Sequence, residues 1–368
     1  MKFSISRDAL LRPLNLVAGV VERRQTLPIL SNVLLVLEGD QLSLSGTDLE
    51  VELVGRVKLA EPATSPGEVT VPARKLVDIC KSLPEGSDID FTVEESKVTV
   101  RSGRSRFTLS TLPARDFPSV EEGAGTHRFT IKQGQLKRLI ERTGFAMAQQ
   151  DVRYYLNGML LEVKSGRLRV VATDGHRLAM CTLPDPVPME EDIQVILPRK
   201  GVLELARLLL DESEDIAVVL GTNHLRATTP DFTFTSKLVD GKFPDYERVL
   251  PRAADKIIIG SRLDLRQAFT RTAILSNEKY RGVRLKLAPE VIEIIANNPE
   301  QEQAEEQVSV EYQGDSVEIG FNVSYLLDVL GVLSGEKVKL SMSDPNSSAL
   351  LEESTDGDSV YVVMPMRL

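Results

Sequence analysis

Apolar residues return at the spacing of an amphipathic helix in three separate stretches of the chain. In the second stretch, Leu136, Leu139 and Ile140 share one face with Thr143 and Met147, while mainly charged residues occupy the other face. The first and third stretches repeat this pattern at Leu10, Leu14, Val17 and Val21, and at Leu265, Ala268, Phe269, Thr272 and Ala273. Pro13 is expected to bend or delay the first helix, because proline lacks a backbone N–H.

A shorter helical pattern and several strand patterns follow each of these stretches. The shorter helices are predicted at residues 74–81, 199–210 and 323–333. Residues 41–45 alternate between apolar and polar, as expected for a strand with one buried and one solvated face. Residues 88–93, 97–101 and 106–112 predict three more strands. Together these elements indicate an α+β fold.

The elements recur because the chain is a threefold repeat. Apolar runs on both sides of Asp174-Gly175 predict a hairpin between antiparallel strands. A step of 126 residues back from Asp174 reaches Asp48, and a step of 124 residues forward reaches Asn298, each in a similar setting. Other short segments also recur at nearly this spacing, which is not expected of a chance match at one residue. We therefore expect three domains, at 1–125, 126–252 and 253–368, each with two helices against antiparallel strands.

The charge of the chain is sorted between helices and the rest. A net charge of −10 would by itself argue against a nucleic-acid partner. However, the helical segments together carry +11, so the remainder carries −21. Glutamate favours helices as much as lysine and arginine do, yet it is scarce in these segments. The distribution therefore favours a positive functional surface over ordinary solvated helix faces.

Composition limits the compartment and the chemistry. No apolar run approaches the roughly 20 residues of a membrane span, and residues 1–4 lack the apolar segment of a signal peptide, so we expect a cytoplasmic protein. Cys80 and Cys181 are isolated and lack metal-ligand spacing. Both are expected to be buried apolar side chains, and neither a metal nor a cofactor is predicted.

Catalytic motifs are missing from the sequence. The three histidines occupy unrelated positions of the repeat, and neither a nucleophile elbow nor a phosphate-binding loop is present. Asp174 and His176 leave open an alternative in which the protein is a hydrolase or metal enzyme. A turn with a half-exposed histidine beside it is the favoured interpretation of these two residues.

Two kinds of interaction surface remain. Residues 149–155 combine amides, an arginine and two adjacent tyrosines, a mixture that contacts nucleic-acid backbone and stacks on bases. Because neighbouring residues of a strand face opposite sides, one of the two tyrosines is expected in the core. Residues 101–106 are basic and residues 300–306 acidic, which fits head-to-tail pairing of two chains, with two solvated loops as the alternative.

Several long motifs resemble the bacterial DNA polymerase III β subunit family, the sliding clamps. They are Thr-Leu-Pro-Ile-Leu at 26–30, Gln-Asp-Val-Arg-Tyr-Tyr-Leu-Asn-Gly-Met-Leu at 150–160, Ala-Thr-Asp-Gly-His-Arg-Leu-Ala at 172–179, Phe-Pro-Asp-Tyr at 243–246, Ile-Leu-Ser-Asn-Glu-Lys at 274–279 and the terminal Met-Pro-Met-Arg-Leu. The resemblance covers the whole chain. Residues 344–346 (Asp-Pro-Asn) depart from the family pattern, as does Gln25, where relatives carry proline.

This resemblance implies three clamp domains per chain and a head-to-tail homodimeric ring, with basic helices around a hole that holds duplex DNA. It implies a non-enzymatic processivity factor for the replicative DNA polymerase. The clamp loader and repair and translesion polymerases would dock through short peptide motifs. The positions that match DNA-contacting residues of the family are Arg24, Arg74, Gln150, Tyr154 and Tyr155.

The resemblance also implies a peptide cleft and a dimer interface. The cleft would be formed by Leu156, Thr173, Gly175, His176, Arg177, Leu178, Pro244, Arg248, Val249, Asn322, Tyr325, Ser348, Val362, Met364, Pro365 and Met366. At the interface, Lys75, Ile79, Leu83, Arg104, Arg106 and Phe107 would face Ile274, Leu275, Glu300, Glu302, Glu305 and Glu306 of the other chain. A clamp paralogue that serves resistance to a clamp-binding inhibitor would have the same motifs, so the sequence leaves that alternative open.

Overall fold

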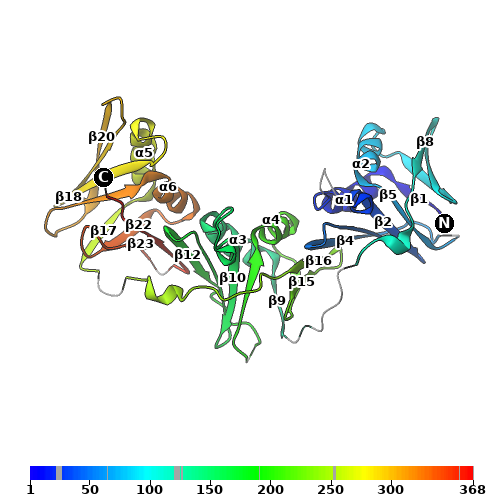
Figure 1. Ribbon diagram of the computed structural model, residues 1–368, viewed down its shortest axis with the longest axis horizontal. Helices are drawn as coiled ribbons and strands as arrows, with labels where there is room; N and C mark the ends of the chain where they lie inside the picture. The colour runs from blue at the N-terminus through cyan, green and yellow to red at the C-terminus, as the bar shows by residue number, and fades with distance from the viewer. Residues whose placement is uncertain are drawn as a thin grey trace. The chain divides into compact units, whose positions relative to one another are not determined.

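The computed structural model describes residues 1–21, 27–63, 65–119, 125, 127–189, 191–251, 254–355 and 357–367. The chain forms two compact units, Met1–Gly134 with Lys200–Leu238, and Gln135–Arg199 with Val239–Leu368. Half of the middle repeat therefore belongs to each unit. Figure 1 shows both units and labels the helices and many of the strands.

The first unit contains two antiparallel sheets with helices packed on them. One sheet has the strand order β1-β6-β7-β8, and the other has the order β5-β2-β3-β4-β16-β15-β14-β9. The elements are β1 (Lys2–Ser6), α1 (Arg7–Ala18), β2 (Asn32–Glu38), β3 (Gln41–Thr47), β4 (Val51–Lys58), β5 (Gly67–Pro72), α2 (Ala73–Ser82), β6 (Asp88–Glu94), β7 (Lys97–Ser102), β8 (Ser105–Ser110), β9 (His127–Lys132), α4 (Arg199–Leu208), β14 (Asp215–Leu220), β15 (His224–Thr228) and β16 (Phe232–Lys237).

The second unit is organised around one twelve-stranded sheet, in the order β13-β10-β11-β12-β24-β23-β22-β17-β20-β19-β18-β21. Its elements are α3 (Gln133–Thr143), β10 (Gly158–Lys164), β11 (Arg167–Thr173), β12 (Arg177–Thr182), β13 (Ile193–Pro198), β17 (Lys256–Ser261), α5 (Arg262–Thr272), β18 (Gly282–Ala288), β19 (Val291–Asn297), β20 (Gln303–Glu311), β21 (Val317–Asn322), α6 (Val323–Val332), β22 (Lys337–Met342), β23 (Ala349–Glu353) and β24 (Ser359–Val363).

The three shorter helices begin within one residue of their predicted starts, and the predicted apolar faces of the three long helices are buried. Ser6 caps α1 by accepting a hydrogen bond from the Ala9 N–H, and Ser261 caps α5 in the same way. Pro13 does not delay the first helix, because α1 begins six residues before it. Leu10 and Leu14 of α1 are fully buried, so packing against the sheet compensates for the proline.

Two strand pairs join successive copies of the repeat, and we call them seams. In the first seam β4 pairs with β16, which places Phe234 opposite Leu53. In the second seam β12 pairs with β24, which places Tyr361 opposite Ala179. Phe234 and Tyr361 are 127 residues apart and both are 0% exposed. The two seams are therefore copies of one arrangement.

Two stretches have a backbone structure that the sequence did not predict. Tyr154 and Tyr155 lie in a 3₁₀ turn, Tyr154–Leu156, so the alternation of a strand does not apply to them. For the acidic stretch the sequence left open a contact surface or a solvated loop, and the structure places residues 303–306 in strand β20. The sequence concealed that strand because glutamate and glutamine have low strand propensity.

Candidate functional site

A small hollow of about 160 Å³ lies in the second unit. It is lined by the 3₁₀ turn before β10, the β11–β12 turn, the segment after β16 and the end of β24. Its lining residues are Arg153, Leu156, Thr173, Gly175, Arg177, Leu178, Pro244, Asp245, Tyr246, Val249, Val362 and Met364. Most of this surface is apolar, with a few polar groups at the rim, which is typical of a binding pocket.

The β11–β12 turn forms one wall and is held by its own side chains. The Asp174 carboxylate accepts hydrogen bonds from the backbone N–H groups of His176 (2.9 Å) and Arg177 (3.0 Å). The Thr173 hydroxyl accepts a hydrogen bond from the Gly175 N–H at 3.1 Å and donates one to the Arg177 carbonyl at 2.6 Å. Gly175 has φ +87°, which glycine adopts without strain. The Asp174 carboxylate therefore has a structural role in this turn.

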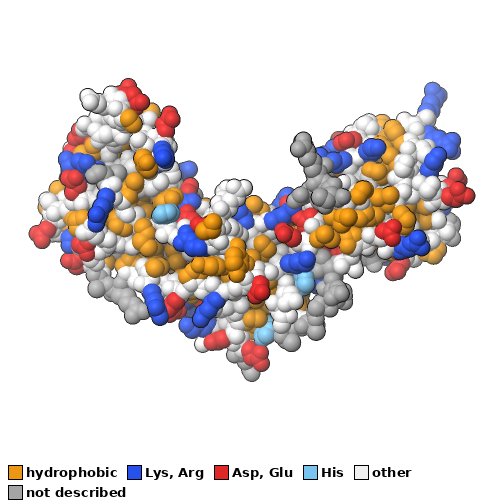
Figure 2. Space-filling model, in the orientation of Figure 1, with side chains coloured by type: hydrophobic (Ala, Val, Ile, Leu, Met, Phe, Trp, Pro, Cys, Tyr) orange, Lys and Arg blue, Asp and Glu red, His pale blue; other side chains and the backbone are white. Residues whose placement is uncertain are grey.

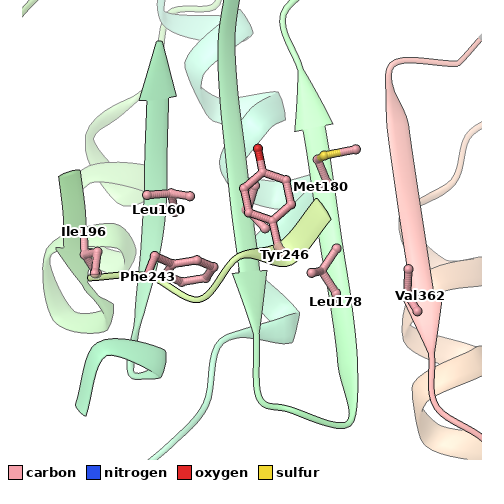
Figure 3. Packing of buried hydrophobic residues seen from close by; sticks show 8 residues of the cluster. Leu160, Leu178, Met180, Ile196, Phe243, Tyr246 and Val362 are labelled. Atoms are coloured by element: carbon pink, nitrogen blue, oxygen red, sulfur yellow. The ribbon is translucent and has the colours of Figure 1, made fainter. Parts of the chain in front are cut away.

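The floor of the hollow is a buried cluster that spans the second seam. Figure 3 shows Phe243 and Tyr246 over strands β10 to β12, with Leu178 beside Val362 of β24. Each of these four side chains is at most 5% exposed. Since the hollow is built on packed core residues, its shape is largely pre-formed.

The hydroxyl of Tyr246 belongs to a buried network of hydrogen bonds. Its hydroxyl donates a hydrogen bond to the Glu162 carboxylate at 2.5 Å and accepts one from the Arg169 guanidinium at 2.8 Å. The Gln194 side chain donates to the same carboxylate. Burial, and next the hydrogen bond to Glu162, raises the pKa of Tyr246 to about 12. The tyrosine therefore stays protonated and keeps the Tyr246–Arg248 turn against the sheet.

Replacing Glu162 by leucine is expected to destabilise the protein by about 1–3 kcal/mol, because several buried donors lose their acceptor. Glu162→Gln keeps a carbonyl acceptor and should cost less. Chemical denaturation monitored by circular dichroism measures both effects. Equal stabilities of the leucine and glutamine variants would show that the network does not hold the turn.

Arg177 joins the hollow to α6. Its guanidinium forms ion pairs with Asp174 (3.2 Å) and Asp328, and donates to the Phe145 carbonyl at 2.8 Å. It also lies 4.5 Å from the centre of the Tyr325 ring, a distance typical of a cation–π contact. Arg177 therefore ties the rim of the hollow to the last copy of the repeat.

The structure brings together much of the cleft that the resemblance implies. Nine of its residues line the hollow, namely Leu156, Thr173, Gly175, Arg177, Leu178, Pro244, Val249, Val362 and Met364. Tyr325 stacks on Arg177, and the Ser348 hydroxyl lies 3.0 Å from the Met364 sulfur. Asn322 instead caps α6, and Arg248 pairs with Asp245 at 2.7 Å. His176 is exposed, and Pro365 and Met366 continue the chain past the hollow.

Arg153, Asp245 and Tyr246 also line the hollow, although they were not among the predicted cleft residues. Each lies in a motif that carries the resemblance, so position in those motifs was the available signal. Arg153 points back over the turn, where its guanidinium would lie 3.0 Å from a Cβ at position 175.

The predicted DNA-contacting residues are exposed in part. Arg74 and Gln150 are exposed, Tyr154 is 58% exposed, and Tyr155 is half-buried against the cluster below the hollow. The two rings meet edge to face at 5.8 Å. Arg24 lies outside the described residues.

The loop that carries Gln150 is stabilised by hydrogen bonds of its own side chains, and we call it the braced loop. The Asp151 carboxylate accepts two hydrogen bonds from the Arg153 guanidinium, at 3.0 and 2.8 Å, and Arg153 lowers the pKa of Asp151 to about 2. The Asn157 side chain bonds the Asp151 backbone N–H and carbonyl. Val152 at the tip is 94% exposed, so the braced loop presents its tip to solvent.

The predicted positive helix surface is smaller than the charge count suggests. Arg138 and Arg142 of α3 pair with Asp358 and Glu353 across the second seam, and Arg271 of α5 pairs with Glu306. These arginines stabilise the fold and are partly neutralised. Among the described residues, helix cations without a carboxylate partner include Arg74, Lys75 and Lys81 of α2 and Arg266 of α5.

The predicted interface residues form two groups, one in each unit, and each group includes an open strand edge. The first group lies on α2, on Leu83 that follows it, and on the β7–β8 hairpin; the second lies on the 3₁₀ turn Ala273–Leu275, on β20 and on the residues just before β20. β8 ends its sheet, and β20 pairs with β17 only at Glu311 and Val310, so both strands leave backbone groups unpaired on one side. Figure 2 shows Lys and Arg side chains over the β7–β8 hairpin, and Asp and Glu side chains over β20. Ile274 is 75% exposed, Leu275 and Ile79 are half-buried, and Leu83 is buried.

The remaining titratable groups bear on metal binding and on thiol reactivity. Within the described ranges, no three or more His, Cys, Asp and Glu side chains gather where they could hold a metal ion. Cys80 and Cys181 are buried, as predicted, and burial raises the pKa of each thiol to about 11. Across these same ranges, no helix has the length and apolar character to cross a membrane. The hollow and the open strand edges are features of a protein that binds partners.

Family models identify this binding protein further. The models for the N-terminal, central and C-terminal domains of the DNA polymerase III beta subunit match residues 1–121, 130–245 and 247–367. The chain belongs to the DNA polymerase III beta subunit family, with three clamp domains.

Relatives and solved structures agree over the full length. The chain is 69% identical to the beta sliding clamp of Pseudomonas aeruginosa and 54% identical to that of Escherichia coli, with 100% of each chain covered. It matches the P. aeruginosa sliding clamp bound to griselimycin with a TM-score of 0.97 and 69% identity, covering 100% of both chains. A Caulobacter crescentus clamp with PEG bound to a putative beta-motif tethering region matches with a TM-score of 0.95 and 41% identity, covering 100% of this chain and 99% of that one.

Proposed function

We propose that two copies of this chain form a head-to-tail ring that encircles duplex DNA and holds the replicative polymerase on it. The protein is a DNA sliding clamp without catalytic activity of its own, and it acts in the cytoplasm. Clamp loader, repair and translesion polymerases dock in the hollow through short peptide motifs. The domains end at 125 and 252, as the repeat predicts.

The observation that carries this proposal is the unfilled third seam. The first and second seams join copies one to two and two to three. Among the residues that the structure describes, the β8 edge of the first copy and the β20 edge of the third pair with no strand of another copy. Phe107 is the residue of β8 that corresponds to Phe234 and Tyr361, each 127 residues further along. It is only half-buried, whereas both counterparts are fully buried. A second chain joined head to tail completes the seam and closes a ring.

The repeat also predicts the register of the intermolecular pair. Thr173 pairs with Leu178 in the second copy, and Asn297 pairs with Gln303 in the third, so Ala179 corresponds to Ala304. Since Tyr361 lies opposite Ala179, Phe107 should lie opposite Ala304 of the other chain. In an antiparallel pair this places Arg106 opposite Glu305, and Leu109 opposite Glu302. Opposite charges then meet at the seam, which stabilises the pair and excludes other registers.

The dimer is expected to weaken as the pH falls. Glu293 lies beside Glu305 and raises the pKa of Glu305, while Glu305 and Lys286 lower the pKa of Glu293. Pairing with Arg106 requires the charged form of Glu305, so its pKa in the dimer is lower than in the separate chain. The Glu305–Arg106 pair therefore stabilises the dimer fully at pH values above the pKa that Glu305 has in the separate chain. This stabilisation is lost as the pH falls through the lower pKa that Glu305 has in the dimer.

Sedimentation of the wild type and of Glu305→Gln, between neutral pH and about pH 4.5, measures this effect. The wild-type dissociation constant should rise more steeply toward acid pH than that of the variant. Identical pH profiles would place Glu305 outside the seam.

DNA contact is proposed for Arg74, Gln150, Tyr154 and Tyr155, together with Arg24. The exposed cations of α2 attract phosphates without reading the base sequence, and the tyrosines and the braced loop offer stacking and hydrogen bonding. Because these contacts are few, binding by contact alone is weak and sensitive to salt, and lasting association requires the closed ring.

Peptide docking is supported by the hollow itself. Apolar walls from two copies of the repeat meet Met364, whose flexible side chain can adapt to different partners. The P. aeruginosa relative binds griselimycin, and the C. crescentus relative holds PEG at a putative tethering region.

Extension of a primer on a circular single-stranded template tests the proposed function. With clamp loader, ATP and replicative polymerase present, adding the protein should lengthen the product made in one binding event. A challenge with excess primed template restricts each polymerase to one such event. Unchanged product length would contradict the function, provided that a known clamp lengthens the product under the same conditions.

A further inference from the structure

A larger hollow, of about 660 Å³, lies in the first unit, beside the pair of strands β4 and β16 that forms the first seam. It is bounded by α1, by the end of β4 and by the turn between β15 and β16. Ala9, Pro13, Leu16, Val57 and Pro230 give it apolar walls. Its volume is within the range of small-molecule sites, and no residue of it belongs to the peptide hollow.

The charges around this hollow are balanced except at one residue. Asp8 pairs with Arg7 at 2.5 Å, and Asp231 pairs with Arg12 at 3.1 Å. Asp40 likewise pairs with Lys58 at 3.0 Å. Each lining carboxylate therefore has its own cation, and the remaining lining cation is Arg56.

Arg56 is half-buried and has no carboxylate partner in the described chain. Its side chain donates a hydrogen bond to the Thr233 hydroxyl at 2.6 Å, and its backbone N–H donates to the Asp231 carbonyl at 2.8 Å. The other half-buried or buried arginines at the seams, Arg142 and Arg177, both have carboxylates. Burial lowers the pKa of Arg56, so its charge is held in an unfavourable environment.

An anion would relieve this cost. A guanidinium has five N–H donors, and one hydrogen bond to Thr233 leaves most of them available. Arg56 lines the hollow and is only half-buried. A carboxylate fits the planar donor fork of arginine, and the apolar walls favour a ligand with an apolar body.

We propose that this hollow binds a small organic carboxylate with an apolar body, whose carboxylate rests on Arg56. Such a ligand contacts α1 and β4 from the first copy and the β15–β16 turn from the second. Because it binds the folded seam, its stabilising effect grows with the logarithm of its concentration above the dissociation constant. The proposal is independent of the peptide hollow and of the ring.

Calorimetric titration of the full-length protein with naphthoate tests the proposal, with naphthylmethanol as the neutral probe of similar shape and inorganic phosphate as the anion without an apolar body. Naphthoate should bind saturably at one site per chain, and each of the other probes should bind at least about tenfold more weakly, since each lacks one half of the recognition. Absence of saturable naphthoate binding, or equal binding of naphthylmethanol or phosphate, would overturn the proposal.

Arg56→Gln should weaken naphthoate binding about tenfold or more. The matched control Lys97→Gln, an exposed lysine of the same unit that does not line the hollow, should change it less than about twofold. An equal loss of naphthoate affinity in both variants would mean that the ligand responds to the overall positive charge of the protein and not to Arg56. A crystal structure of the wild type with naphthoate keeps the test valid if Arg56→Gln folds poorly. Carboxylate density away from Arg56 would contradict the assignment.

Discussion

Ile274→Asp should turn the dimer into a folded monomer. Ile274 is 75% exposed in the single chain and lies outside every domain core. Its counterpart in the second copy is Phe145, since the 3₁₀ turns Gly144–Ala146 and Ala273–Leu275 correspond. Phe145 stacks on Tyr361 at 5.9 Å across the second seam. Ile274 is therefore expected to pack on Phe107 of the other chain.

The expected weakening of the dimer follows from the burial of Ile274 in the proposed interface. Losing a buried isoleucine costs about 1.5–3 kcal/mol, and placing an unpaired carboxylate there adds to the loss. The ring has two such seams, so one substitution acts twice. The neighbouring Leu275 is left unchanged in this test, because it is half-buried within its own chain and its replacement would also disturb the fold.

Light scattering after size exclusion measures the mass, and circular dichroism confirms the fold. Leu210→Asp is the matched control, because Leu210 is 66% exposed and does not belong to the proposed interface. It should remain dimeric. A dimeric Ile274→Asp protein would show that the seam has been placed wrongly.

Gly175→Leu should abolish ligand binding in the peptide hollow while leaving the fold intact. The first copy carries this substitution naturally, since Leu49 occupies the corresponding turn with φ +77°. Its Thr47 and Asp48 side chains make the same hydrogen bonds as Thr173 and Asp174. The turn thus accepts leucine, at a strain of about 1–2 kcal/mol.

The leucine would occupy the mouth of the hollow and displace Arg153. A Cβ at position 175 lies 3.0 Å from the Arg153 guanidinium, and that flexible side chain can move away. In a hollow of about 160 Å³, the added side chain removes the space that an anchor residue needs. Affinity for griselimycin or a docking peptide should fall by about a hundredfold or more, which corresponds to a few kcal/mol.

Surface plasmon resonance with immobilised protein measures this loss. Leu49→Gly makes the reverse change in the first copy and should leave ligand affinity unchanged. If Gly175→Leu binds griselimycin as tightly as the wild type, the ligand does not use this hollow.

Much of the fold could be predicted from the sequence because each element occurs in three copies of the repeat, so its residue pattern could be compared three times. Apolar spacing located all three long helices, and the shorter helices at 74–81, 199–210 and 323–333 match α2, α4 and α6 within two residues. The acidic strand β20 was missed in part, because open edges carry charged residues that conceal strand character.

The candidate site was harder to predict because its key contacts join distant segments. Nothing local links Glu162 to Tyr246, which are 84 residues apart, or Arg177 to Asp328, which are 151 apart. The charge count likewise could not show that Arg138 and Arg142 are paired across the second seam. Pairing of this kind depends on the tertiary fold, which residue spacing does not report.

Topological linkage to DNA is the central claim, and one measurement tests it directly. Labelled protein is loaded by clamp loader and ATP onto a nicked circular plasmid, and its retention is followed before and after a single cut of the circle. A closed ring should stay on circular DNA at high salt and leave within seconds to minutes once an end is made, because only topology holds it. Equal retention on circular and cut DNA would mean that the protein grips DNA by contact, and would contradict the ring.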